Sequence, residues 1–164
     1  MKERTGTIVF VIKDGMVLLA KKTRVLGIGL WNGYGGGFDS ETDQDLADCA
    51  VREFGEESGG ASICKSDVEK VAYIEFHNGD SFLFKAHVFI VNNIIDIPTD
   101  SGEMIEPTWF SVDELPPKEQ FMDSDMHWIP RILKGEKLIA DVWYDGNFNL
   151  TERGVEIKKV DVLD

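Results

Sequence analysis

This 164-residue chain has little of several things that define whole classes of protein. Its 2 cysteines, Cys49 and Cys64, show no C-x-x-C spacing and no nearby group of histidines, which number only 3. A disulfide framework and a Cys/His zinc site are therefore excluded. Basic residues are also few, with 17 Lys and Arg against 30 Asp and Glu, a formal net charge of −13. That balance argues against a nucleic-acid polymer as partner, because such binding depends on many cationic contacts to phosphates.

Long apolar runs are missing as well, so no segment is expected to cross a bilayer. The first residues, Met-Lys-Glu-Arg-Thr-Gly, lack the apolar stretch of a signal peptide. We therefore expect a cytoplasmic protein with no membrane partner and with reduced cysteines. The length fits a single domain over residues 1–164 with a core of its own, and we expect a monomer.

The apolar pattern predicts strands on both sides of a central helix. Three pairs of β-rich runs surround turn signals such as Asp14-Gly15, and one short run stands alone: residues 6–13 with 16–22, 71–76 with 81–91, 138–144 with 149–158, and 108–112. A first helix follows the N-cap residue Asp45 and is closed by Gly59, and a second spans residues 125–133. The expected fold class is α+β, a mixed β-sheet sandwiched between α-helices.

The first helix carries an unusual set of charges in residues 52–59, Arg-Glu-Phe-Gly-Glu-Glu-Ser-Gly. At about 100° per residue, Glu53, Glu56 and Glu57 fall within an arc of roughly 100°. Arg52 lies four residues before Glu56 and can pair with it. Clustered carboxylates repel one another, so this arrangement is costly without a cation. Hard oxygen ligands that leave room for water suit Mg²⁺, or alternatively Mn²⁺, bound together with a phosphate.

These acidic residues have two other interpretations. A solvated helix end is the ordinary meaning of a charge run, but here a glycine-rich loop, residues 31–37, leads into the helix, and glycine lets bare backbone approach a ligand. The alternating acids from Asp39 to Asp45 invite a calcium-loop interpretation. That interpretation fails, because Gln44 and Ala50 stand at the sixth and twelfth positions, where Gly and Glu are needed.

Loop and helix together resemble the Nudix box, whose second half is matched by Arg52, Glu53, Phe54, Glu56, Glu57 and Gly59. Gln44 stands where the family has its first Glu, and Gly60 takes the final apolar position. Nearly the whole chain is similar to the MutT-type branch of this family. The further matches are residues 27–36, Gly102-Glu103-Met104, Trp109-Phe110 and residues 113–116.

The resemblance implies Mg²⁺-dependent hydrolysis of oxidised purine nucleoside triphosphates, such as 8-oxo-dGTP, to the monophosphate and pyrophosphate. Such a reaction removes damaged nucleotides from the nucleotide pool. Two alternatives stay open: a Nudix pyrophosphatase acting on ADP-ribose or a dinucleoside polyphosphate, and a non-catalytic Nudix module that binds a nucleotide. The catalytic set implied is Arg52, Glu53, Glu56, Glu57 and Glu103, and the same four glutamates would bind metal with a backbone carbonyl of Gly35 or Gly36.

For the substrate, the resemblance implies that Lys22 contacts the phosphates and that Asn32 and Asp123 hydrogen-bond the purine edge. Phe121 stands where the family relative has Trp. A second acidic residue follows the position of Asp123 in the relative, whereas here Ser124 comes next and Asp125 one residue later, with an apparent one-residue insertion. Phe is a smaller stacking surface without an indole N–H. The residues alone allow simpler meanings. Lys22 could be a strand-end charge and Asn32 a turn cap. Asp123 could be a helix N-cap and Phe121 a core aromatic.

Overall fold

The computed structural model describes residues 4–163. Along that part of the chain it has eight strands, two α-helices and two short 3₁₀ helices. In order they are β1 (Thr5–Lys13), β2 (Met16–Lys22), β3 (Trp31–Asn32), α1 (Leu46–Glu57), η1 (Lys65–Asp67), β4 (Glu69–Asn78), β5 (Ser81–Val91), β6 (Met104–Ser111), η2 (Lys118–Gln120), α2 (Asp125–Leu133), β7 (Lys137–Tyr144) and β8 (Leu150–Val160).

The turns carry the backbone geometry that their residues favour. Asp14 and Gly15 both have positive φ, 54° and 75°, as a two-residue hairpin turn of type I′ requires. The three predicted hairpins are confirmed as β1–β2, β4–β5 and β7–β8. The short strand predicted at residues 108–112 is longer than expected, because β6 already begins at Met104.

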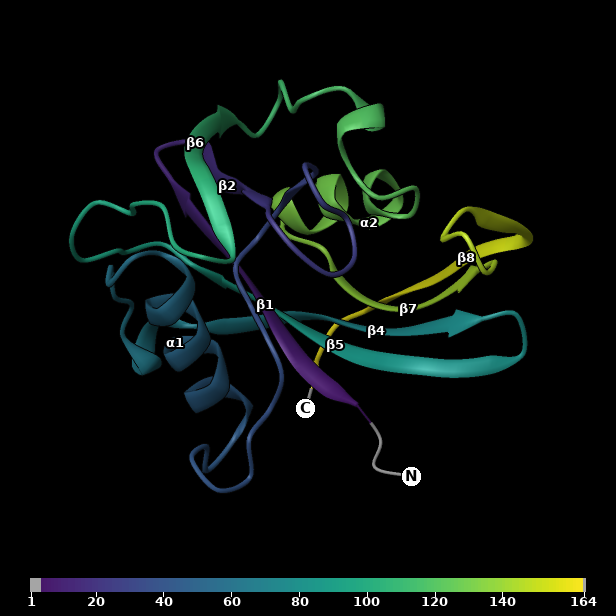
Figure 1. The fold of residues 1–164 in the computed structure, drawn as a ribbon, viewed down its shortest axis with the longest axis horizontal. Coiled ribbons are helices and arrows are strands. Elements are labelled where there is room, and N and C mark those ends of the chain that lie inside the picture. The colour runs from purple at the N-terminus through teal and green to yellow at the C-terminus, as the bar shows by residue number, and fades with distance from the viewer. Residues whose placement is uncertain (1–3, 164) are drawn as a thin grey trace.

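The strands form one mixed sheet in the order β3-β2-β1-β5-β4-β7-β8, with β6 paired to β2 (Figure 1). β1 pairs with β5 in parallel, as β4 does with β7, and the other pairings are antiparallel. The parallel pairs bring segments far apart in the sequence into register. In consequence the final hairpin, β7–β8, extends the sheet beyond β4.

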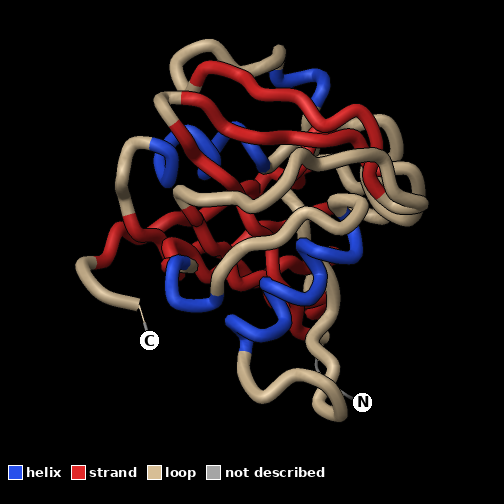
Figure 2. The backbone as a smooth tube through the Cα atoms, turned by 90° about the vertical axis from the view of Figure 1, so that its left-hand side faces the viewer, coloured by secondary structure: helices blue, strands red, loops and turns tan. Residues whose placement is uncertain are grey.

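The two helices cover opposite faces of this sheet. Successive side chains of β1 point to opposite faces, so alternate residues pack against different helices. Val9 and Val11 belong to a buried cluster with Phe54 of α1, whereas Phe10 between them packs in a second cluster with Trp128 of α2. Figure 2 shows the strands between helical segments. The predicted α+β sandwich is therefore confirmed.

The structure also bears on the expectations about membrane spans and cysteines. No helix within residues 4–163 has the length and apolar character needed to span a membrane. Cys49 is buried and Cys64 is exposed, and both are free cysteines.

Candidate active site

Helix α1 is held at both ends by the residues that the sequence assigned to that role. The side chain of Asp45 accepts a hydrogen bond from the Asp48 N–H at 2.8 Å, and Gly59 adopts φ +72° just after the helix. Ala50 and Phe54 are buried against the sheet. The helix therefore presents its carboxylates at the rim of the core, over the glycine-rich loop.

The backbone of that loop passes close to strand β1 at Gly35 and close to the Glu53 side chain at Gly36. A Cβ on Gly35 would lie 1.7 Å from the Thr7 carbonyl oxygen, and one on Gly36 would lie 2.4 Å from the Glu53 carboxylate. The Gly35 N–H donates to Glu57 Oε1 at 2.7 Å. The Gly36 carbonyl already accepts from the Thr7 N–H at 2.9 Å, which leaves the Gly35 carbonyl as the better candidate ligand.

Clustered negative charge marks this end of the site. Burial raises the pKa of Glu57, and the nearby carboxyl of Glu103 raises it further. Burial also raises the pKa of Glu53. Glu56 projects outward, with its side chain 61% exposed. A set of hard oxygen donors whose charge is poorly compensated suits a divalent cation of the Mg²⁺ type, so the residues present fit the expected metal.

Arg52 is fixed mainly by a residue that the sequence did not single out as its partner. Its guanidinium donates two hydrogen bonds to Asp43, both of 2.8 Å, and a third of 2.8 Å to Glu53. These bonds hold the pKa of Asp43 down, to about 2. The predicted contact to Glu56 is present but longer, at 3.4 Å. Arg52 thus ties the loop before α1 to the helix and orients Glu53.

The loop between Gly37 and Asp45 contains a local turn. The carbonyl of Asp39 accepts from the N–H groups of Thr42 and Asp43, and the Asp43 carboxylate accepts from the Asp39 N–H at 2.9 Å. The alternating acids are therefore turn-forming and ion-pairing residues. The only sequence signal for Asp43 was that alternation, which does not indicate Arg52 as its partner.

A second ion pair reaches the carboxylate cluster from the loop between β2 and β3. Arg24 pairs with the carboxylate of Glu103, while the Glu103 carbonyl accepts from the Thr23 N–H at 3.0 Å. Lys22, at the end of β2, lies nearby, and burial lowers the pKa of its ammonium group. Two cationic side chains therefore flank the acidic cluster.

A cavity of about 410 Å³ connects this cluster with a more apolar region near α2. It is lined by Glu57 and residues 35–37 at one end, by Lys22 between, and by Asn32, Asp125 and Trp128 at the other. The volume is in the range of small-molecule sites in proteins. An elongated ligand can thus reach both ends at once.

Unpaired polar atoms mark the far end of the cavity. Asp125 is 5% exposed and its Oδ2 has no hydrogen-bond partner among the described residues, and the same holds for the indole N–H of Trp128. Burial raises the pKa of Asp125 to about 7. Asn32 accepts a hydrogen bond from the Gly33 N–H at 2.8 Å, which leaves its amide NH₂ able to donate. Buried groups of this kind are normally satisfied, so these atoms are available to hydrogen-bond a ligand that enters the cavity.

Two residues expected in the base pocket do not line this cavity. From η2 to the first residue of α2, the cavity lining includes Met122 and Asp125 but neither Phe121 nor Asp123. Phe121 is 3% exposed and packs in the core with Trp128. Asp123 is exposed and accepts a hydrogen bond from the Leu150 N–H at 3.3 Å.

The path of the chain after η2 explains why Phe121 and Asp123 do not line the cavity. Phe121 is extended and turns into the core, and helix α2 then starts one residue later than an N-cap at Asp123 would require. Ser124 occupies the N-cap position without a side-chain cap. The N-cap interpretation of Asp123 is therefore wrong, and the acidic residue that faces the cavity is Asp125.

An α+β fold with carboxylates gathered over a glycine-rich loop, and a cavity leading away from them, defines a class of protein suited to binding a phosphorylated ligand with a divalent cation. Residues 2–132 match the family model described as NUDIX domain. The chain belongs to the Nudix family.

Individual relatives agree with this assignment. The oxidized purine nucleoside triphosphate hydrolase of Danio rerio is 32% identical over 151 residues, which is 92% of each chain. The mouse protein of the same name is 36% identical over 135 residues, 82% of each chain. The crystal structure of a MutT protein from Bacillus halodurans superposes with a TM-score of 0.76 at 20% identity, covering 94% of this chain and 97% of that one. At that identity the likeness shows a shared fold.

Proposed function

We propose that this protein is a Mg²⁺-dependent hydrolase of oxidised purine nucleoside triphosphates, with 8-oxo-dGTP as a representative substrate and a nucleoside monophosphate and pyrophosphate as products. The observation that carries the proposal is the single cavity that joins the carboxylate cluster at Glu57 to the unpaired carboxyl of Asp125. The names of the fish and mouse relatives support the substrate class.

At the acidic end, the metal ligands would be Glu53, Glu56, Glu57 and Glu103, with the Gly35 carbonyl. A bound Mg²⁺, or Mn²⁺ in its place, would neutralise phosphate oxygens and lower the pKa of the attacking water. One of these carboxylates would accept a proton from that water. Arg52 acts by positioning, since it holds Glu53 through its bonds to Asp43.

Lys22 lies between the two ends and would bind the phosphates of the substrate. The negative charges of Glu57, Asp125 and Glu103 attract its ammonium group, and they lie toward both ends of the cavity. A phosphate chain that enters with its cation would replace these carboxylates as the partner of Lys22. This contact keeps the triphosphate aligned along the cavity.

At the other end we propose that Asp125 and Asn32 read the purine edge. Asp125 with a raised pKa is able to donate from its carboxyl as well as accept, and Asn32 donates from its amide. An oxidised purine differs from the normal base in its pattern of carbonyl oxygens and N–H groups. A buried pair of donors and acceptors discriminates strongly between such patterns, because the wrong base leaves them unpaired.

The remaining expectations complete the proposal. We propose a monomeric cytoplasmic enzyme whose residues 1–164 form one domain. The final hairpin lies outside the family match at 2–132, but β7 pairs with β4 along seven residues, from Ala72↔Leu138 to Asn78↔Tyr144. That pairing argues for one cooperative unit.

The test is Mg²⁺-dependent pyrophosphate release from 8-oxo-dGTP beside dGTP, 2-oxo-dATP, dATP and ADP-ribose, with a coupled phosphatase to register products of ADP-ribose. We expect the highest kcat/KM for an oxidised purine triphosphate. Activity on ADP-ribose alone would keep the metal site and overturn the base pocket. Nucleotide binding without turnover of any substrate would favour the non-catalytic module.

A further inference from the structure

A cluster of metal-ligating side chains lies on the side of the sheet away from the cavity. Glu75 and His77 of β4 and Asp141 of β7 are all half-buried, and one potential ligand atom from each lies within 4.8 Å of the other two. Phe76, between Glu75 and His77, lines the cavity on the opposite face. Strand β4 therefore separates this cluster from the site described above.

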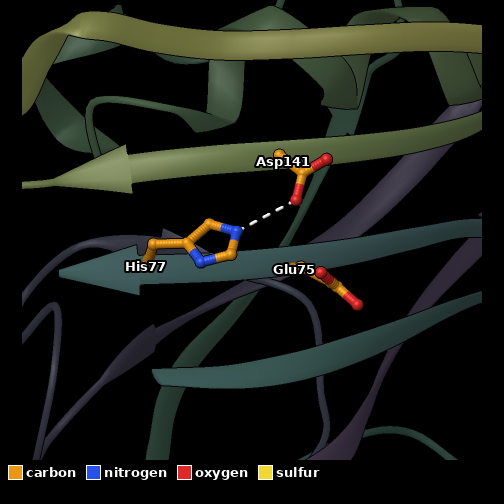
Figure 3. Close-up of side chains that lie close together, drawn as sticks. All are labelled: Glu75, His77 and Asp141. Atoms are coloured by element: carbon orange, nitrogen blue, oxygen red, sulfur yellow. Dashed lines mark hydrogen bonds and ion pairs between the residues drawn. The ribbon is translucent and has the colours of Figure 1, made fainter. Parts of the chain in front are cut away.

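The backbone brings these three side chains together. β4 and β7 are parallel neighbours, and Glu75 and Asp141 are Cα partners in their register. His77 follows Glu75 by two residues, so both point to the same face of the strand. Figure 3 shows His77 and Asp141 joined by the hydrogen bond between Nε2 and Oδ1, of 2.9 Å, with Glu75 beside them.

Surrounding groups hold the candidate ligands in orientation. The ring of His77 stacks on Trp143, with centroids 5.1 Å apart and planes inclined by 12°, and it meets Phe82 edge-on with centroids 6.2 Å apart. The Tyr73 hydroxyl donates to Glu75 Oε1 at 2.6 Å. Contacts of this kind to ligand side chains are a regular feature of protein metal sites.

We propose that Glu75, His77 and Asp141 form a second metal site, which takes a divalent transition metal of the Zn²⁺ type. An imidazole with two carboxylates suits zinc, nickel or copper, whereas the all-oxygen set at α1 suits Mg²⁺. Three protein ligands leave a coordination position for water. The metal would replace the hydrogen bond between His77 and Asp141 with two metal–ligand bonds.

The position of this site gives the metal a structural role. It would join β4 to β7 and so fasten the final hairpin, which lies beyond the family match, to the rest of the sheet. A metal that binds the folded state alone stabilises it by mass action. The proposal does not rest on the proposed hydrolase activity.

The first experiment is a calorimetric titration of the metal-free full-length protein with Zn²⁺, compared with His77→Ala and the isosteric Asp141→Asn. Loss of a ligand should weaken one Zn²⁺ equivalent at least as much as loss of an outer-shell group does, about 10–100-fold. His127→Ala, at an exposed histidine, and Cys64→Ser, at the exposed thiol, should keep it. Equal Zn²⁺ binding by the wild type and both ligand variants would overturn the proposal.

A second readout locates the metal without relying on loss of binding. Because His77 stacks on Trp143, Ni²⁺ bound at this site should quench the fluorescence of that indole. We expect the quenched fraction to disappear in Trp143→Phe, which keeps an aromatic ring against His77, while its Zn²⁺ stoichiometry stays unchanged. Quenching of the same size in Trp143→Phe, or no quenching of the wild type at saturating Ni²⁺, would place the metal elsewhere.

Discussion

At one end of the cavity the carboxylates of Glu53 and Glu57 come from a single helix, whereas at the other end Asn32 and Asp125 come from segments far apart in the sequence. The helix is fixed by its own cap, and it packs over a loop in which a Cβ at Gly35 would lie 1.7 Å from the Thr7 carbonyl oxygen. The far end depends on how the chain between η2 and α2 enters the core.

This difference has a physical consequence for recognition. Helical spacing ties the three glutamates of α1 to one another, so a change in the loops moves them together. Where α2 begins, a shift of two residues decides whether Asp123 or Asp125 faces the cavity. We therefore expect metal binding to tolerate loop changes and base preference to respond to them.

The largest expected effect is at the acidic end. Replacing Glu57 or Glu56 with Gln removes a charge and keeps the side-chain shape. We expect kcat for 8-oxo-dGTP to fall about 10²–10⁴-fold, as for loss of a metal-bound or proton-accepting carboxylate, with an unchanged circular dichroism spectrum. Steady-state pyrophosphate release measures the rate.

Glu41→Gln serves as the matched control for these two variants, because Glu41 is an exposed acid of the neighbouring loop. Its rate should equal that of the wild type. Near-full turnover by both helix variants would show that the carboxylates of α1 do not take part in catalysis.

The next effect compares two aspartates two residues apart. Asp125→Asn should lower kcat/KM for 8-oxo-dGTP about 10–100-fold, the size of one buried hydrogen bond to a charged or ionisable group. Asp123→Asn should change it little, because Asp123 is exposed and bonds to Leu150. The same substrate panel, run on both variants, measures the preference.

The reverse outcome for the two aspartates would restore the register expected from family resemblance and would show that the cavity lining changes on ligand binding. A loss confined to kcat, with the preference among bases intact, would instead assign Asp125 a role in folding.

The acidic end was predictable because its rules are local. Asp45 as a cap, Gly59 as a stop and the spacing of the glutamates are all properties of one helix and its ends. The hairpins followed from similar local signals, such as Asp14-Gly15. These features were predicted at the correct positions.

Other features depend on contacts made only in the folded chain. β3 has two residues and exists because it pairs with β2, and β6 extends back to Met104 for the same reason. The bidentate bond of Arg52 to Asp43 depends on a turn that no local pattern announces. Asp125 is buried by the packing of α2 and lines the cavity, a position that no local pattern in the sequence indicates.

A smaller effect is expected where the loop meets the helix. Asp43→Asn loses the charge that anchors Arg52, and we expect the free energy of unfolding at neutral pH to fall by about 1–2 kcal/mol, the worth of two hydrogen bonds. The pKa of Asp43 is lowered, so its contribution is present above the ordinary Asp pKa and is lost as the pH falls toward 2. Urea denaturation measures the difference.

Asp80→Asn, in the exposed turn between β4 and β5, is the control for this substitution and should leave stability unchanged. If Asp43→Asn proves as stable as the wild type at neutral pH, then Arg52 is held by Glu53 and the Gly37 carbonyl without help from Asp43.

The smallest expected effect is a difference in the pH dependence of stability between the wild type and Asp125→Asn. Because the pKa of Asp125 is raised to about 7, the folded state binds a proton that the unfolded state has lost, and stability falls as the pH rises through this window. Asp125→Asn has no such proton. Its free energy of unfolding, relative to the wild type, should therefore rise by about 1 kcal/mol from about pH 6 to about pH 8. Urea titrations of both metal-free proteins test this, and parallel curves would contradict a raised pKa at Asp125. Glu57 also has a raised pKa, but it is present in both proteins, so the difference between them isolates the end of the cavity that would bind the base.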